Sequence, residues 1–130
     1  MGRKERLQAF TAQYDQEARA KYGHQQVEDA NRKMMHLPEE QFARWQALDA
    51  QILTCLEAAV TADLGADSGE AKEIAQLHKE WLMISVPSYT TQMHRGIAMM
   101  YVCDERFTQY YDRNVTGCAK LLSDAVQHWI

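Results

Sequence analysis

Three cysteines and five histidines are the side chains of this 130-residue sequence that could act as nucleophiles or bind a metal ion. Cys55, Cys103 and Cys118 lie far apart and form no CxxC pair, so we interpret them as free thiols. The sequence contains no HExxH or GxSxG motif, no glycine-rich phosphate loop and no repeated ExxH pattern. These observations predict that the protein is not an enzyme and holds no metal ion or cofactor.

Two histidines, His78 and His94, fall on the apolar faces of predicted helices. A histidine in this position is most often a core residue that donates to a backbone carbonyl. Alternatively, the pair supplies the polar groups of an otherwise apolar ligand cleft, because a neutral imidazole both donates and accepts. A third possibility is a globin-like haem or tetrapyrrole site, which needs a histidine above an aromatic pocket.

Aromatic residues and methionines are concentrated in one stretch of the sequence. The aromatic members are Trp81, Tyr89, Tyr101, Phe107, Tyr110 and Tyr111, and the interleaved methionines are Met83, Met93, Met99 and Met100. Buried tyrosine hydroxyls need hydrogen-bond partners, and methionine adapts to irregular shapes. The composition is therefore typical of an adaptable pocket for a large apolar ligand with some polar atoms. The alternative is a tyrosine-rich core whose hydroxyls reach solvent.

The spacing of apolar residues by threes and fours predicts an all-α protein. We expect a long helix from Pro38 to about residue 60, followed by a turn at Gly65. Its apolar stripe consists of Phe42, Trp45, Leu48, Ile52, Leu56, Ala59 and Val60. A second helix, with a capping box from Asp67 to Glu70, should end before Pro87. Further helices are predicted after a cap at Thr90 or Thr91, after a cap at Asp104, and over residues 115–129.

The charge distribution divides the chain at Pro38. Residues 1–36 hold seven basic and five acidic side chains, whereas residues 37–130 hold seven basic and thirteen acidic ones. The first segment carries few large apolar residues, among them Phe10, Tyr14 and Met35. Ordering a residue costs about 1–2 kcal/mol of backbone entropy, so these anchors alone do not hold the segment folded. We predict an N-terminal helical arm over 1–36 that folds only against something, and a helical core over 37–130, within a single domain.

The overall composition excludes several classes of protein. Eighteen acidic against fourteen basic residues, a net charge of −4, argue against a general nucleic-acid binder. No apolar run is long enough to span a membrane, and the N-terminus lacks the apolar segment of a secretion signal. Together with the free thiols, these features predict a cytoplasmic protein.

Three segments carry a family resemblance. They read Leu-His-Lys-Glu-Trp from Leu77, Tyr-Thr-Thr-Gln-Met-His-Arg-Gly from Tyr89, and Met-Tyr-Val-Cys-Asp-Glu-Arg-Phe from Met100. The chain resembles the TipA-S antibiotic-recognition domain over nearly its whole length. That domain is the C-terminal effector half of thiostrepton-induced activators of the MerR type, and it also occurs alone in drug-binding proteins, including albicidin-binding relatives.

The resemblance implies a globin-like helical fold without haem, and a cleft for bulky, ring-rich antibiotics of the thiopeptide or albicidin kind. It also implies an N-terminal part that closes over the ligand as a lid, where we expect Phe10, Tyr14 and Met35 to contribute contacts. Carried over to this sequence, the residues that line or border the cleft are His78, Trp81, Tyr89, His94, Tyr101 and Tyr111.

Two departures from the family pattern shape the expected function. Thiopeptide-capturing members have a cysteine a few residues before the Met-His pair, and this sequence has Tyr89 there, so binding should be non-covalent. No DNA-reading helix-turn-helix precedes the domain, so we expect no direct nucleic-acid contact. The leading hypothesis is a non-enzymatic antibiotic-binding domain, either the effector part of an activator or a stand-alone drug-sequestering protein. The alternatives are the haem or tetrapyrrole binder and a structural helical assembly module.

Overall fold

The computed structural model describes residues 24–130, and this part of the chain is built from helices and their connections. The helices are α3 (His24–Met35), α4 (Glu39–Thr61), α5 (Gly69–Ser85), α6 (Thr91–Cys103), α7 (Glu105–Asp112) and α8 (Cys118–Trp129). The prediction of an all-α fold is therefore confirmed. None of these described helices is both long enough and apolar enough to cross a membrane.

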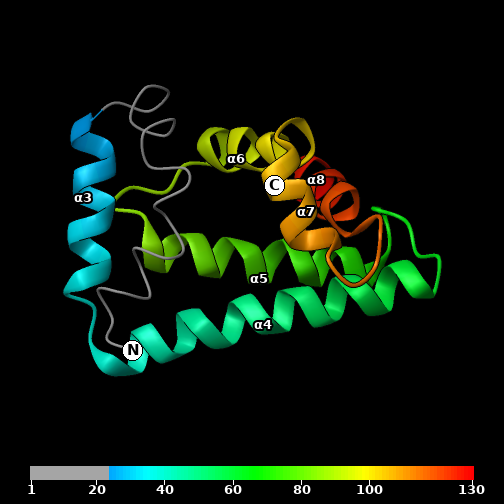
Figure 1. Ribbon diagram of the computed structural model, residues 1–130, viewed down its shortest axis with the longest axis horizontal. Helices are drawn as coiled ribbons and strands as arrows, with labels where there is room; N and C mark the ends of the chain where they lie inside the picture. The colour runs from blue at the N-terminus through cyan, green and yellow to red at the C-terminus, as the bar shows by residue number, and fades with distance from the viewer. Residues whose placement is uncertain (1–23) are drawn as a thin grey trace.

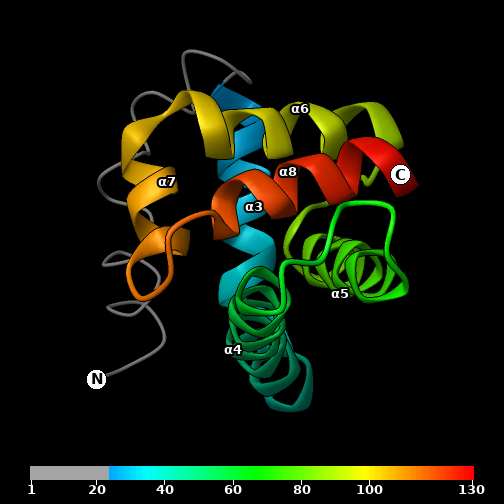
Figure 2. The ribbon, with the colours of Figure 1, turned by 90° about the vertical axis from the view of Figure 1, so that its right-hand side faces the viewer.

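The helices form two layers. Helices α4 and α5 run side by side in opposite directions (Figure 1). Helices α6 and α8 pack on each other and cross over the first pair, while α7 lies at one end of this second layer (Figure 2). Helix α3 stands against the C-terminal part of α5. This arrangement is consistent with the globin-like order that the family resemblance implies.

The core lies between the two layers. The stripe predicted for the first long helix is the inner face of α4, where the buried residues are Phe42, Trp45, Leu48, Ile52, Leu53, Leu56 and Ala59. Helix α8 covers this stripe with Cys118, Leu122 and Val126, which are fully buried. Each large apolar side chain removed from water contributes about 1.5–3 kcal/mol, so this packing fixes the helices that carry the site.

Side-chain caps fix where the site-bearing helices begin. Thr90 accepts a hydrogen bond from the Met93 amide at 3.0 Å and starts α6, and Asp104 does the same for Arg106 at the start of α7. Both caps were among the sequence predictions. Helix α5, however, is capped by Ser68, whose hydroxyl accepts from the Ala71 amide at 3.1 Å, so the expected cap at Asp67 is wrong by one residue.

Two predicted boundaries are also wrong. The turn after α4 places Asp63, with φ of 57°, in the left-handed region, and Gly65 has no positive φ. Aspartate tolerates that conformation better than most residues, which the expectation of a glycine overlooked. The last helix begins at Cys118 instead of Val115, because Gly117 adopts a left-handed conformation with φ of 106° and interrupts the helical path.

The predicted break at Pro38 is confirmed as a helix boundary. Helix α3 ends at Met35 and α4 begins at Glu39, with Pro38 in an extended conformation between them. Of the proposed arm, the structure describes only residues 24–36.

Candidate functional site

Two fully buried histidines meet where α5 packs near α6. His78 comes from the inner face of α5 and His94 from the first turn of α6, just after the Thr90 cap. His78 Nδ1 lies 2.7 Å from His94 Nε2, so the two rings share one hydrogen bond. The expectation that a core histidine donates to a backbone carbonyl is wrong here, because the partners of both rings are side chains.

Tyrosine hydroxyls extend this pair at both ends. Tyr89 Oη lies 2.7 Å from His94 Nδ1, and Tyr101 Oη lies 3.0 Å from His78 Nε2. Tyr101 in turn packs against Tyr111 with ring centroids 4.9 Å apart. The result is a continuous chain of side chains, Tyr89–His94–His78–Tyr101–Tyr111, which runs from a half-buried end at Tyr89 into the interior.

A row of stacked rings meets this chain at His78. Phe42 stacks on Trp45 with centroids 5.8 Å apart, Trp45 on Trp81 at 5.5 Å, and Trp81 on His78 at 5.5 Å. The row ends with His94, whose ring centroid is 4.9 Å from that of His78. Aromatic pairs of this kind contribute about 0.5–1.5 kcal/mol each beyond the burial of their area. The histidines are therefore held in place by packing as well as by hydrogen bonds.

Both histidines of the site are neutral near pH 7. Burial, and then the neighbouring His94, lower the pKa of His78 to about 3. Burial, and then the Lys79 ammonium, lower the pKa of His94 to about 4. A neutral imidazole has one N–H donor and one acceptor nitrogen, so each ring can donate to one neighbour and accept from the other.

A second polar contact stands beside the aromatic chain. The Tyr110 hydroxyl donates to the Asp49 carboxylate at 2.6 Å, and the Arg113 guanidinium lies 4.5 Å over the Tyr110 ring. Burial, together with this bond, raises the pKa of Tyr110 to about 12. Burial likewise raises the pKa of Tyr111 well above its ordinary value. This contact ties α7 to α4 next to the site.

The structure brings together most of the residues predicted to line a ligand cleft. These are His78, Trp81, Tyr89, His94, Tyr101 and Tyr111, which are joined by the hydrogen bonds, by the stacked row or, for Tyr111, by ring contact with Tyr101. Met35 lies at the end of α3 with 38% of its surface exposed. Phe10 and Tyr14 lie outside the described residues. That these side chains bind ligand remains a prediction.

Sequence reasoning missed two members of the cluster, Phe42 and Trp45. Both were assigned to the core stripe of the first long helix, where their spacing does place them. The signal that could have identified Trp45 is its aromatic character on the face of α4 that packs against α5, because aromatic side chains on facing helices tend to stack.

The haem alternative does not fit this geometry. A histidine that ligates iron needs a free ring nitrogen, and all four ring nitrogens of His78 and His94 are in hydrogen bonds. Within residues 24–130, no group of three or more His, Cys, Asp or Glu side chains is placed to hold a metal ion.

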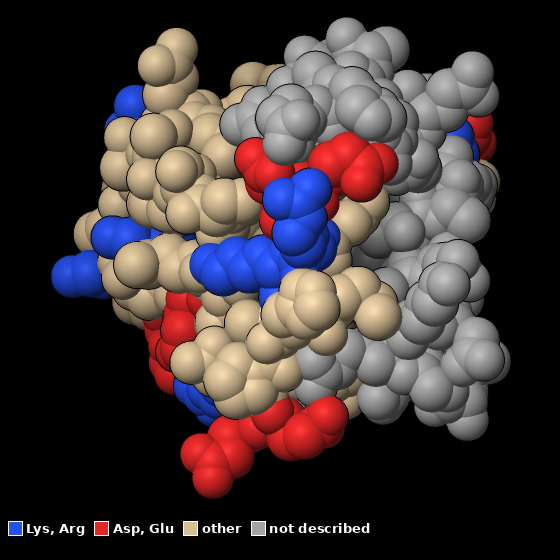
Figure 3. All heavy atoms as spheres, turned by 90° about the vertical axis from the view of Figure 1, so that its left-hand side faces the viewer, with Lys and Arg blue, Asp and Glu red and all other residues tan. Residues whose placement is uncertain are grey.

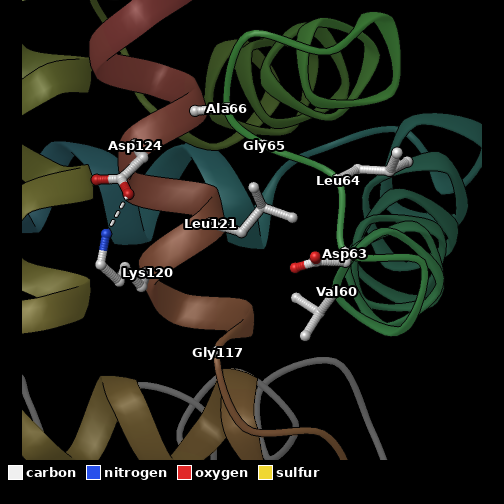
Figure 4. A pocket seen from close by; sticks show the side chains of 9 residues that line it. All are labelled: Val60, Asp63, Leu64, Gly65, Ala66, Gly117, Lys120, Leu121 and Asp124. Carbon is white, nitrogen blue, oxygen red and sulfur yellow. Dashed lines mark hydrogen bonds and ion pairs between the residues drawn. The ribbon is translucent and has the colours of Figure 1, made fainter.

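A surface cleft of about 330 Å³ lies away from the aromatic site, between the end of α4, the α4–α5 connection and the start of α8. Val60, Leu64 and Leu121 supply its apolar wall, and Lys120 is paired with Asp124 at 2.6 Å on its rim (Figure 4). It provides a natural control region for binding experiments, since it shares no residue with the stacked row.

The side of the molecule on which α3 lies carries both positive and negative side chains. Figure 3 shows basic and acidic side chains close together on the described part of this face. A nucleic-acid interface would carry a predominantly basic surface instead, and the net charge of the chain is −4.

Sequence comparison assigns this helical chain to a class of ligand-recognition domains. The profile of the TipAS antibiotic-recognition domain matches residues 14–129, and the chain belongs to this family.

Its relatives include the HTH-type transcriptional activators TipA of Streptomyces coelicolor and of Streptomyces lividans. Each is 28% identical over 115 residues, which cover 88% of this chain and 46% of the activator. The chain thus spans about half the length of these relatives. Among solved structures, TipAS of Streptomyces lividans in complex with nosiheptide is similar, with a TM-score of 0.73 and 28% identity. That match covers 88% of this chain and 81% of the other.

Proposed function

We propose that this chain binds a bulky, ring-rich peptide antibiotic of the thiopeptide class, without covalent capture and without catalysing a reaction. The observation that carries the proposal is the row of stacked rings that ends in two buried, neutral histidines. Aromatic side chains suit heteroaromatic rings, and the hydrogen-bonded chain contains the few polar groups that would orient a ligand. The similarity to TipAS, solved with nosiheptide, supports the same ligand class.

The biological setting that we propose is a reducing cell interior, where the chain acts as the effector part of a TipA-like activator or as a drug-sequestering protein. The three free thiols support such a compartment. In either setting this chain contacts the antibiotic and not DNA.

We also propose that residues 1–36 form an arm that covers the ligand. Helix α3, the described part of this arm, is attached to the rest of the protein near the Tyr89 end of the site. Lys33 Nζ donates to the carbonyl oxygens of Met83 and Val86 at 3.0 and 2.7 Å, and Met34 is buried. We infer that α3 opens from these contacts to admit the ligand.

The proposal is tested by titrating the protein with nosiheptide while tryptophan fluorescence is followed. Of the three tryptophans, Trp129 donates to the Ala66 carbonyl beside the surface cleft, so a Trp129→Phe background leaves the signal to Trp45 and Trp81. In that background Tyr89→Ala and Tyr101→Ala should each weaken binding by about 1–4 kcal/mol, as expected for aromatic anchors. Leu64→Ala, in the surface cleft, is the matched control. Unchanged affinity in both variants, with both still folded, would refute the proposed location of the antibiotic-binding site.

Non-covalent binding has its own test. Burial raises the pKa of the Cys118 thiol to about 11, and burial also raises that of Cys55, so neither is a ready nucleophile. Intact mass spectrometry after incubation with a dehydroalanine-bearing thiopeptide should show the unmodified protein. A mass increase of one drug molecule that disappears in Cys103→Ser would show that the exposed thiol of Cys103 captures the drug.

A further inference from the structure

The chain Tyr89–His94–His78–Tyr101, which we name the Tyr–His relay, permits only two arrangements of its hydrogens. Both imidazoles are buried, and each has one N–H and one acceptor nitrogen. Because His78 Nδ1 faces His94 Nε2 directly, one of these atoms must carry the hydrogen and the other must not. The choice at this central bond then fixes the direction of the bonds on either side.

In the inward arrangement, every donor points from Tyr89 towards the interior. The Tyr89 hydroxyl donates to His94 Nδ1, His94 Nε2–H donates to His78 Nδ1, and His78 Nε2–H donates to the Tyr101 oxygen. Both histidines are then Nε2–H tautomers. In the outward arrangement every bond is reversed, both histidines are Nδ1–H tautomers, and His94 donates to the Tyr89 oxygen.

Charges at the two ends favour the inward arrangement. At the Tyr89 end, the Lys79 ammonium lies 5.4 Å over the tyrosine ring, and the positive charge of Arg95 also acts on the Tyr89 hydroxyl. At the opposite end, the Asp49 carboxylate acts on Tyr111, beyond Tyr101. Hydrogens that point away from the cations and towards the carboxylate lower the electrostatic energy.

We propose that the Tyr–His relay sets the polarity of the Tyr89 hydroxyl, so that its oxygen is presented to the antibiotic as a hydrogen-bond acceptor. The group selected on the ligand is then a donor, such as an amide N–H or a hydroxyl. Within the described residues, the Tyr89 hydroxyl has no protein partner other than His94, and its side chain is the half-buried end of the relay. This inference rests on the proposed antibiotic-binding function and makes Tyr89 a specificity-determining residue.

A substitution at the far end of the relay should reverse it. In Tyr101→Phe, the inward arrangement would leave the His78 Nε2–H buried without an acceptor. The outward arrangement would leave only an acceptor nitrogen without a donor. A buried N–H without a partner is the less tolerated of the two. Tyr101→Phe should therefore convert both histidines to the Nδ1–H tautomer, including His94, which Tyr101 does not touch.

Nitrogen-15 NMR of histidine-labelled protein at pH 7 reads out both tautomers directly. We expect Nε2–H at His78 and His94 in the parent protein, and Nδ1–H at both in Tyr101→Phe. Lys79→Met, which removes the cation over the Tyr89 ring, should raise the Nδ1–H population of both histidines together, whereas Lys120→Met on α8 should not. Nδ1–H tautomers in the parent, or a His94 that stays Nε2–H when His78 switches, would overturn the relay.

Nosiheptide titration separates the relay from the binding function itself. Tyr89→Phe and Tyr101→Phe should each weaken binding by about 3- to 10-fold, as expected for one hydrogen bond between neutral groups. In the double variant, Tyr101→Phe should add no further loss, because it acts only through the Tyr89 hydroxyl. Full affinity in Tyr89→Phe would overturn the relay proposal and leave antibiotic binding standing. If the parent protein fails to bind nosiheptide while the tautomers are as expected, the proposed ligand is wrong instead.

Discussion

The aromatic–histidine site and helix α3 lie next to each other but are held in different ways. The inner rings of the chain and of the row contact neighbours on both sides, and His78 is enclosed by Trp81, His94 and Tyr101. Helix α3 is attached through the buried Met34 and the hydrogen bonds of Lys33 to the end of α5. The first region is held by ring packing and side-chain hydrogen bonds. The proposed role of α3 in a cover requires that the second region open more readily than the first.

The largest expected effect comes from breaking the stacked row. Trp45→Ala removes the ring between Phe42 and Trp81 and should lower the free energy of unfolding by about 3–5 kcal/mol. Urea denaturation measures this loss, and the exposed Gln51→Ala on the same helix should change stability by less than about 0.5 kcal/mol. A loss below about 1 kcal/mol for Trp45→Ala would mean that the row is loosely packed.

The second largest effect is expected from pH: lowering the pH should reduce the free energy of unfolding. The histidines have folded-state pKa values of about 3 and 4, below the ordinary 6.5, so the unfolded chain binds their protons first. Their contribution to stability is complete above about pH 6.5 and is lost as the pH falls towards 4, by up to about 1.4 kcal/mol per pH unit for each histidine.

The check is urea denaturation between pH 7 and pH 4.5, compared with His94→Gln. The variant should show a shallower pH dependence, because one of the two groups that titrate only on unfolding is gone. If the free energy of unfolding depended on pH equally in both proteins, His94 would take up its proton in the folded state as readily as in the unfolded chain, contrary to the prediction.

The position of the helices could be predicted from the sequence, but the pairing of their side chains could not. Caps such as Thr90 and Asp104 act within three residues, and the stripe of α4 repeats with the helical period, so both are local signals. His78 and His94 were each assigned to an apolar face. Their contact depends on how α5 and α6 pack across the turn between them, which periodicity does not specify.

The contacts of residues at the edges of the site could not be predicted from the sequence either. Tyr110 was predicted only as a member of the aromatic stretch. Its bond to Asp49 joins residues 61 positions apart, and no local pattern indicates it. The resemblance to the TipA-S family supplied what periodicity lacked, since it implied that Tyr89, His94 and Tyr101 belong to one site. The expected participation of Phe10 and Tyr14 remains a prediction.

The smallest effect is expected at α3. Lys33→Met keeps the aliphatic stem but removes the hydrogen bonds to the carbonyls of Met83 and Val86, so α3 should open more readily by about 1 kcal/mol. Hydrogen exchange should quicken roughly fivefold in α3 and stay unchanged in α5 and α6. Arg32→Met, which alters an exposed charge on the same helix, is the control. Equal acceleration throughout the core would mean that α3 is an integral part of it and no separable cover.

The central claim is that a thiopeptide binds at the aromatic–histidine site, and amide chemical-shift mapping during a nosiheptide titration tests it most directly. We predict saturable shifts that cluster on residues 78–101 and on α3, with little change at Val60, Leu64 and Leu121 around the surface cleft. Shifts centred on that cleft, or no saturable change at any amide, would contradict the account.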